Sequence, residues 1–298
     1  MPIVRTPDKR FSALPDFPFA PHYIDLTGLR LHYVDEGKGE PVLCLHGEPT
    51  WSFLYRKIIR TLSIQHRVLA MDFIGFGRSD KFTEREAYTF QMHCDTLERF
   101  IQSMNLGQIT LVVQDWGGLI GLAVVADMPE RFGRLVIMNT GLPTGDTKPS
   151  EAFLAWRNFV QNNSDLPIGW VILGGVAHPE KITKEVIAAY EAPFADASYK
   201  AGAAMWPLLV PIRPEDPGAA EMRHAREVLS RWNKPALVMF SDRDPITWGG
   251  NTLFRSLIPT AKDQPEIIIN DAGHFLQEEK GEEISQHILE FVRRTPFT

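Results

Sequence analysis

Apolar runs rich in β-branched residues recur along the chain, separated by segments of helical length. Six such runs occupy residues 41–46, 66–73, 109–114, 134–139, 234–241 and 265–271. Runs of this kind indicate strands buried on both faces, and their alternation with helices indicates a mostly parallel sheet. An earlier segment, 22–37, alternates polar and apolar residues around Gly28, which predicts a hairpin at the exposed edge of that sheet.

The alternation of strand-like runs and helical segments is interrupted once. Residues 142–213 contain no strand-like run, are rich in Trp, and are bracketed by Pro-containing segments at 140–150 and 206–218. Because strands resume afterwards, this block fits an insertion better than a terminal domain. We therefore expect an α/β core of residues 1–141 and 214–298, with helices on both faces of a twisted sheet, and an inserted helical cap at 142–213.

Composition narrows the class of partner. The 298 residues include 31 Lys and Arg against 37 Asp and Glu, and the net charge is −6 with both signs scattered. No basic face for nucleic acid or anionic lipid is expected, nor a membrane span or a signal-peptide core. The two cysteines, Cys44 and Cys94, are too few for a disulfide framework. We expect a cytoplasmic protein, monomeric or weakly homo-oligomeric, that acts on a small uncharged molecule.

The segment LVVQDWGGLIGL, residues 111–122, has the strand, tight turn and helix on which many hydrolases mount a serine nucleophile. The residue at the apex is Asp115. Such a turn places its apex above the carboxyl edge of the sheet, where open α/β sheets bind ligands, and Gly117 and Gly118 allow close packing of the helix. A helix-capping role for Asp115 is the alternative. The other candidate site residues decide between capping and catalysis.

His274 follows the last predicted strand, in NDAGHFLQE, where the base of a hydrolase with this element order is expected. The main rivals are His46, in the loop expected to build an oxyanion hole, and His93, in a helix distant from the active edge. No HExxH motif or Cys/His cluster suggests a metal.

The third member of a triad is expected on the loop after strand 234–241, where SDRDPI offers two acids. We favour Asp244 because Pro245 fixes its backbone, whereas Asp242 is typical of a turn residue that bonds its own backbone. The other possible location, at the end of strand 134–139, carries Asn139, which cannot be an anionic partner.

A carboxylate at the apex suits displacement at a saturated carbon, because it is anionic at neutral pH and needs no base. The product would be an ester of Asp115. Its hydrolysis would need His274 to activate water and Asp244 to orient the ring. The backbone N–H groups of Glu48, in LCLHGEPTWS, and of Trp116 are the expected oxyanion-hole donors.

The group that leaves determines the reaction. The indole N–H of Trp116 is a donor without an acceptor, which suits a departing halide. A second donor is expected from the cap, and sequence periodicity does not choose among its candidates, Trp156, Trp170 and Trp206.

Two other functions remain as alternatives. An epoxide hydrolase would need an acid for the epoxide oxygen, and the cap offers Tyr190 and Tyr199. A non-catalytic binding protein on a hydrolase fold is the second alternative, and it requires the complete triad to be coincidental.

Five segments carry a family resemblance: LCLHGEPTWSFLYRKII, MDFIGFGRSDK, LVVQDWGGLIGL, APFADASYKAG and DAGHFLQE. Together they resemble the haloalkane dehalogenases of the α/β-hydrolase superfamily, most closely the branch typified by the Xanthobacter enzyme for short dihaloalkanes. Epoxide hydrolases share the HGxP turn and the aspartate, but HGEPTWS together with QDWGG is specific to the dehalogenases.

The resemblance implies an α/β-hydrolase fold and hydrolysis of a haloalkane to an alcohol, a halide and a proton, with water as co-substrate and no cofactor. It places the second halide-binding residue at Trp156, within FLAWRNF, and agrees with Asp244 as the acid. Phe153, on the same helical face as Trp156, would then line the substrate pocket.

Overall fold

The computed structural model describes residues 2–163 and 165–297, and its centre is an eight-stranded sheet. The strand order is β10-β9-β8-β7-β4-β5-β3-β2. The strands are β2 (His22–Leu26), β3 (Leu29–Glu36), β4 (Pro41–Leu45), β5 (Arg67–Met71), β7 (Ile109–Gln114), β8 (Phe132–Met138), β9 (Ala236–Ser241) and β10 (Ile267–Ile269). Strands β10 to β5 are parallel, whereas β3 runs antiparallel to β5 and β2 antiparallel to β3. The six predicted strands and the edge hairpin are therefore confirmed. The predicted burial of the last strand on both faces is wrong, because β10 lies at the other edge of the sheet and Ile268 is 37% exposed.

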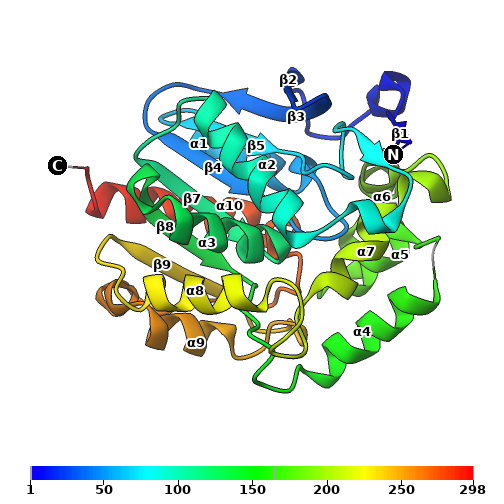
Figure 1. The fold of residues 1–298 in the computed structure, drawn as a ribbon. Helices are drawn as coiled ribbons and strands as arrows, with labels where there is room; N and C mark the ends of the chain where they lie inside the picture. Colours follow the sequence, from blue (N-terminus) through cyan, green and yellow to red (C-terminus); the bar gives the residue numbers. More distant parts are fainter. Residues whose placement is uncertain (1, 164, 298) are drawn as a thin grey trace.

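Helices cover both faces of the sheet, so the central strands are buried on both sides (Figure 1). On one face α3 packs against α2 and α8, and on the other α1 packs against α10. The core helices are α1 (Arg56–Leu62), α2 (Phe90–Ser103), α3 (Trp116–Asp127), α8 (Ala219–Leu229), α9 (Gly250–Leu257) and α10 (Leu276–Arg294). Every residue of β7 is buried, which explains why its sequence is apolar without alternation.

Between β8 and β9, the described residues (139–163 and 165–235) form helices and no strand. Before α8 it forms α4 (Glu151–Asn162), α5 (Ile168–Gly174), α6 (Lys184–Glu191) and α7 (Ala201–Leu209), which gather at one end of the sheet (Figure 1). The Ser150 hydroxyl accepts a hydrogen bond from the Phe153 N–H at 3.1 Å and caps α4. This helical block agrees with an inserted cap, while the division at 142 and 213 remains a prediction.

Short elements complete the chain. The 3-10 helices are η1 (Asp8–Phe11), η2 (Ser52–Tyr55), η3 (Arg85–Ala87), η4 (Pro129–Arg131), η5 (Pro179–Lys181), η6 (Ala197–Tyr199) and η7 (Pro259–Asp263). Strands β1 (Ile3–Val4) and β6 (Lys81–Phe82) form a separate antiparallel pair. Sequence patterning did not predict this pair, because two-residue strands have no period to detect.

Two further expectations concern cysteines and membranes. Cys44 and Cys94 are free and buried, so they pack as small apolar side chains. Within the described residues, no helix is both long enough and apolar enough to cross a membrane.

Candidate active site

The turn between β7 and α3 presents Asp115 in a backbone conformation that non-glycine residues rarely adopt. Its φ is 49° and its ψ is −126°, in the left-handed half of backbone space. A Cβ on Gly117 would collide with the Leu45 carbonyl oxygen, and one on Gly47 would collide with the Asp115 side chain. Glycine at both positions therefore lets the turn pack closely against the loop after β4.

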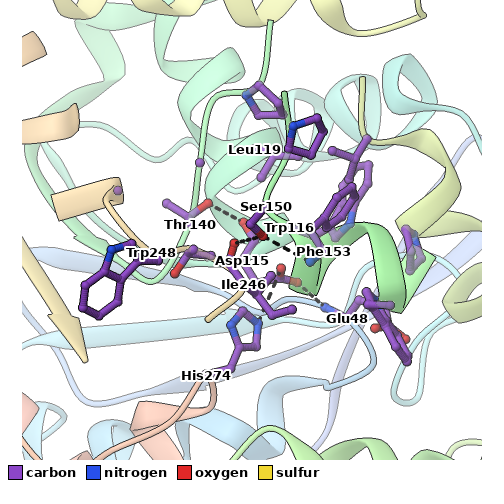
Figure 2. Close-up of a pocket in the computed structure, with 18 of the residues that line it drawn as sticks. Glu48, Asp115, Trp116, Leu119, Thr140, Ser150, Phe153, Ile246, Trp248 and His274 are labelled. Atoms are coloured by element: carbon purple, nitrogen blue, oxygen red, sulfur yellow. Dashed lines mark hydrogen bonds and ion pairs between the residues drawn. The ribbon is translucent and has the colours of Figure 1, made fainter. Parts of the chain in front are cut away.

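The Asp115 side chain accepts no capping hydrogen bond from α3. Its Oδ1 instead accepts a hydrogen bond from the Glu48 backbone N–H at 2.7 Å. Figure 2 shows Asp115 between Glu48 on one side and His274 on the other. The geometry thus favours the chemical role for Asp115 over the capping role.

His274 bridges two carboxylates. Its Nδ1 lies 2.8 Å from Asp244 Oδ2, and its Nε2 lies 3.6 Å from Asp115 Oδ2. His274 and Asp244 are both buried. The order nucleophile, acid and base along the chain is that of a hydrolase triad with aspartate as the nucleophile.

Hydrogen bonds distinguish the two acids of the loop after β9. Asp244 Oδ1 accepts the Ile246 N–H at 2.8 Å, and Oδ2 accepts the Thr247 hydroxyl as well as facing His274. Asp242 instead accepts the Asp271 N–H at 2.8 Å, which ties two loops together, so the expectation that Asp242 bonds its own backbone is wrong. The structure therefore places Asp244, and not Asp242, beside His274.

The charges of the triad shift its pKa values. Burial alone would lower the pKa of His274, but the Asp244 and Asp115 carboxylates outweigh burial and raise it to about 10. Burial would raise the pKa of Asp244, yet the facing His274 and its hydrogen bonds lower it. Burial, reinforced by the charge of Asp115, raises the pKa of Glu48 well above its ordinary value.

The rival histidines are committed elsewhere. His46 Nε2 accepts the Phe73 N–H at 3.1 Å, and its Nδ1 faces the Gly47 carbonyl oxygen at 3.0 Å. His93 Nε2 accepts the indole N–H of Trp206 at 2.7 Å. Burial lowers the pKa of His93 to about 3. Both rings serve as packed, hydrogen-bonded core residues.

A pocket of about 470 Å³ lies above the triad, and Asp115 and His274 are among its walls. Trp116, Trp156 and Phe153 line it together, and Figure 2 shows Trp116 beside Asp115. Apolar side chains form much of the remaining wall, among them Leu119, Leu142, Val171, Val210, Leu253 and Phe275. A mostly apolar pocket with few polar groups suits a small uncharged substrate.

The three cap tryptophans occupy different environments. Trp206 is fully buried, donates its N–H to His93, and stacks on Trp116 at a centroid distance of 5.1 Å. Trp170 lines the pocket but is 59% exposed. Trp156 lines the pocket and stacks on Phe159 at 5.8 Å. The structure thus excludes Trp206 as a donor to the pocket and leaves Trp156 as the better sheltered candidate.

The two predicted oxyanion-hole donors differ in their present contacts. The Glu48 N–H already contacts Asp115 Oδ1. Trp116 is the first residue of α3, where backbone N–H groups lack partners within the helix, and no bond from its N–H to Asp115 occurs among the described contacts. The role of Trp116 in the oxyanion hole therefore stays a prediction.

Two residues of the site were not predicted. Gln114 Nε2 lies 3.1 Å from His274 Nε2. Asn139 Nδ2 donates to the carbonyl oxygens of Gly273 and His274 at 3.1 and 3.2 Å and so anchors the loop that carries His274. Gln114 ends β7 and Asn139 directly follows β8, and this position at the carboxyl edge of the sheet could have signalled their involvement.

No group of three or more His, Cys, Asp or Glu side chains in residues 2–163 and 165–297 is arranged to hold a metal ion.

Comparison with known proteins identifies the family. Residues 40–281 match the family model described as alpha/beta hydrolase fold. The chain is 46% identical over 304 residues to a haloalkane dehalogenase from Psychrobacter cryohalolentis, covering 99% of this chain and 100% of that relative. A haloalkane dehalogenase from Mycolicibacterium paratuberculosis is 46% identical over 297 residues, covering 97% and 98%.

A solved structure agrees with this result. The haloalkane dehalogenase DpaA from Paraglaciecola agarilytica superposes with a TM-score of 0.91 at 36% identity, covering 97% of this chain and 98% of that one. These similarities do not test the Xanthobacter-type branch, which stays a prediction. They confirm the broader resemblance, and the chain belongs to the haloalkane dehalogenase family of the α/β-hydrolase fold.

Proposed function

We propose that this protein hydrolyses the carbon–halogen bond of haloalkanes to give an alcohol, a halide ion and a proton, with water as the only co-substrate. The observation that carries the proposal is the alignment of Asp115, His274 and Asp244 beneath a mostly apolar pocket lined by Trp116 and Trp156. Family membership supports it, since the relatives named above are haloalkane dehalogenases.

In the first step, a carboxylate oxygen of Asp115 attacks the carbon that bears the halogen. The carbon–halogen bond breaks, the halide leaves with the bonding electrons, and an alkyl ester of Asp115 forms. The indole N–H groups of Trp116 and Trp156 stabilise the departing anion, because charge developing in an apolar site gains most from fixed donors.

In the second step, His274 takes a proton from water, and the oxygen of that water bonds to the Asp115 carbonyl carbon. The Glu48 N–H, 2.7 Å from Oδ1 in the free site, stabilises the oxyanion, with the Trp116 N–H as the second proposed donor. The bond from that carbon to the alkyl oxygen then breaks. His274 returns its proton to the alkoxide, and the second proton of the water leaves Asp115 as a carboxylate.

Neither cap tyrosine that the epoxide alternative requires lines the pocket. The Tyr190 hydroxyl donates to Glu278 Oε2 at 2.6 Å, outside the pocket, and Tyr199 is not among the pocket walls. Assays with 1,2-dibromoethane and with styrene oxide separate the two reactions. We expect bromide release from the first and no diol from the second, and diol formation without bromide release would refute the proposal.

The non-catalytic alternative is addressed by the same assay, since a binding protein would release no bromide.

A cytoplasmic location and a monomeric or weakly homo-oligomeric state are further proposals from the sequence. The Paraglaciecola relative is described as tetrameric, so size-exclusion chromatography is the direct test of the second.

A further inference from the structure

The amide of Gln114 is oriented by a backbone carbonyl. Gln114 ends β7, its side chain is fully buried, and its Nε2 lies 3.2 Å from the carbonyl oxygen of His274. A carbonyl oxygen only accepts hydrogen bonds, so the group that faces it must be the NH₂ of the amide. The reverse orientation would set two acceptors against each other.

The same NH₂ group also faces the imidazole ring of His274. Gln114 Nε2 is also 3.1 Å from His274 Nε2. Because an amide NH₂ only donates, it favours a lone pair on the ring nitrogen that it faces. The ring proton then resides on Nδ1, which donates to Asp244 Oδ2 at 2.8 Å.

Acidic groups around the ring act in the opposite direction to Gln114. Asp115 follows β7, Asp244 follows β9, and Glu48 lies in the loop after β4. Asp115 and Asp244 favour the imidazolium form of His274, while burial favours the protonated, neutral form of Glu48. When Asp115 carries an alkyl group it loses its charge, so its attraction on a proton at Nε2 disappears, while Asp244 still faces Nδ1.

We infer that Gln114 is a positioning residue that keeps His274 Nε2 unprotonated in the alkyl-enzyme, so that this nitrogen is ready to accept a proton from water. The inference rests on the proposed function. The amide keeps its bond to the His274 carbonyl oxygen while Nε2 takes the proton, so the step needs no other reactant. Attack on the haloalkane does not involve His274 as a base, and Gln114 should leave that step unaffected.

Two substitutions test this role. Gln114→Met keeps the approximate shape but removes the donor, and Gln114→Glu supplies a carboxylate that favours a proton on Nε2. In single turnovers with 1,2-dibromoethane, from pH 5 to 10, the rates of bromide release and of alcohol formation report the two steps separately. In the Met variant, we expect the acid limb of the pH–rate profile for alcohol formation to move up by about 0.4 to 1.1 pH units. This shift is the equivalent of losing one hydrogen bond to the unprotonated ring.

In the Glu variant, the acid limb of alcohol formation should move further in the same direction. In both variants, the rate of bromide release should stay within about twofold of wild type. Gln277→Met is the matched control, because Gln277 is also fully buried and has no hydrogen bond to His274 among the described residues. An acid limb unchanged in both Gln114 variants, or bromide release slowed as much as alcohol formation, overturns the inference.

The amplitude of bromide release is proportional to the concentration of folded active sites. Misfolding of a variant therefore lowers the amplitude, whereas the rates measured on the folded fraction stay valid. If the Met variant gives no amplitude, the Glu variant decides alone. Failure of the proposed function looks different, because wild type would then release no bromide in the first turnover.

Discussion

The Nε2 atom of His274 lies 3.6 Å from the Oδ2 atom of Asp115. This separation exceeds a direct hydrogen bond, yet it leaves the ring beside the carboxyl carbon that water would attack. The ring is therefore suited to serve the second step of the reaction, the hydrolysis of an ester on Asp115, and unnecessary for the first.

Replacement of His274 by Phe should trap that ester. We expect His274→Phe to release one halide per active site and then stop, with a mass increase of one haloalkyl group located on the peptide that contains Asp115. Stopped-flow halide detection and peptide mass spectrometry measure both. Asp115→Ala is the control, with neither burst nor adduct and turnover lowered by roughly 10⁴- to 10⁶-fold. A His274→Phe protein that never accumulates an adduct would contradict the ester mechanism.

Removal of one indole N–H should weaken halide binding. Trp156→Phe deletes a charge-assisted donor worth about 1.5 to 3 kcal/mol, so the bromide inhibition constant should rise roughly 10- to 150-fold. Trp170→Phe is the matched control, because Trp170 lines the same pocket but is 59% exposed, and its inhibition constant should change less than twofold. If Trp170→Phe has the larger effect, the second donor is Trp170.

The triad should make stability depend on pH. Since Asp244 and Asp115 outweigh burial and raise the pKa of His274 to about 10, from an unfolded value near 6.5, the protonated ring stabilises the fold. That contribution is complete below about pH 6.5 and is lost as the pH rises through about 10. The difference in Tm between wild type and Asp244→Asn should therefore shrink between these limits.

Asp242→Asn is the control for this pH dependence. Asp242 bonds the Asp271 and Ala272 N–H groups and does not contact the ring, so its Tm difference from wild type should stay constant over the same range. A constant difference for Asp244→Asn as well would show that His274 and Asp244 are not coupled in the folded protein.

The pocket volume predicts a preference for chains longer than two carbons. A pocket of about 470 Å³ falls within the roughly 300 to 1,000 Å³ typical of sites for much larger ligands. Each methylene buried against its apolar wall contributes about 0.8 kcal/mol, or roughly fourfold in kcat/KM. We expect kcat/KM to rise from 1-bromopropane to 1-bromohexane. A maximum in kcat/KM at two or three carbons would show that the pocket available to the bound substrate is much smaller than this volume.

Most of the fold could be predicted from the sequence, because buried parallel strands and covering helices leave strong periodic signals. The strands from Pro41 to Ile269 and the edge hairpin are examples. The β1–β6 pair was not predicted, because it depends on contacts between distant two-residue segments, such as Ile3 with Phe82. Local periodicity carries no information about such contacts.

The candidate site was predictable where a residue has a distinctive place in the chain order, as Asp115, Asp244 and His274 do. Choosing among the cap tryptophans by residue pattern alone was not possible, since a Trp that lines a pocket and one that bonds a buried histidine look alike in sequence. Only the fold shows that Trp206 donates to His93. Gln114 was missed for the same reason, because its partner lies 160 positions away.

The central claim is that the oxygen of the product alcohol comes from the Asp115 carboxylate and not directly from water. A single turnover in water labelled with ¹⁸O, with enzyme in excess over a bromoalkane, tests it most directly. The account predicts unlabelled alcohol and one ¹⁸O atom in the peptide that contains Asp115. Label in the alcohol, with none in the protein, would contradict it.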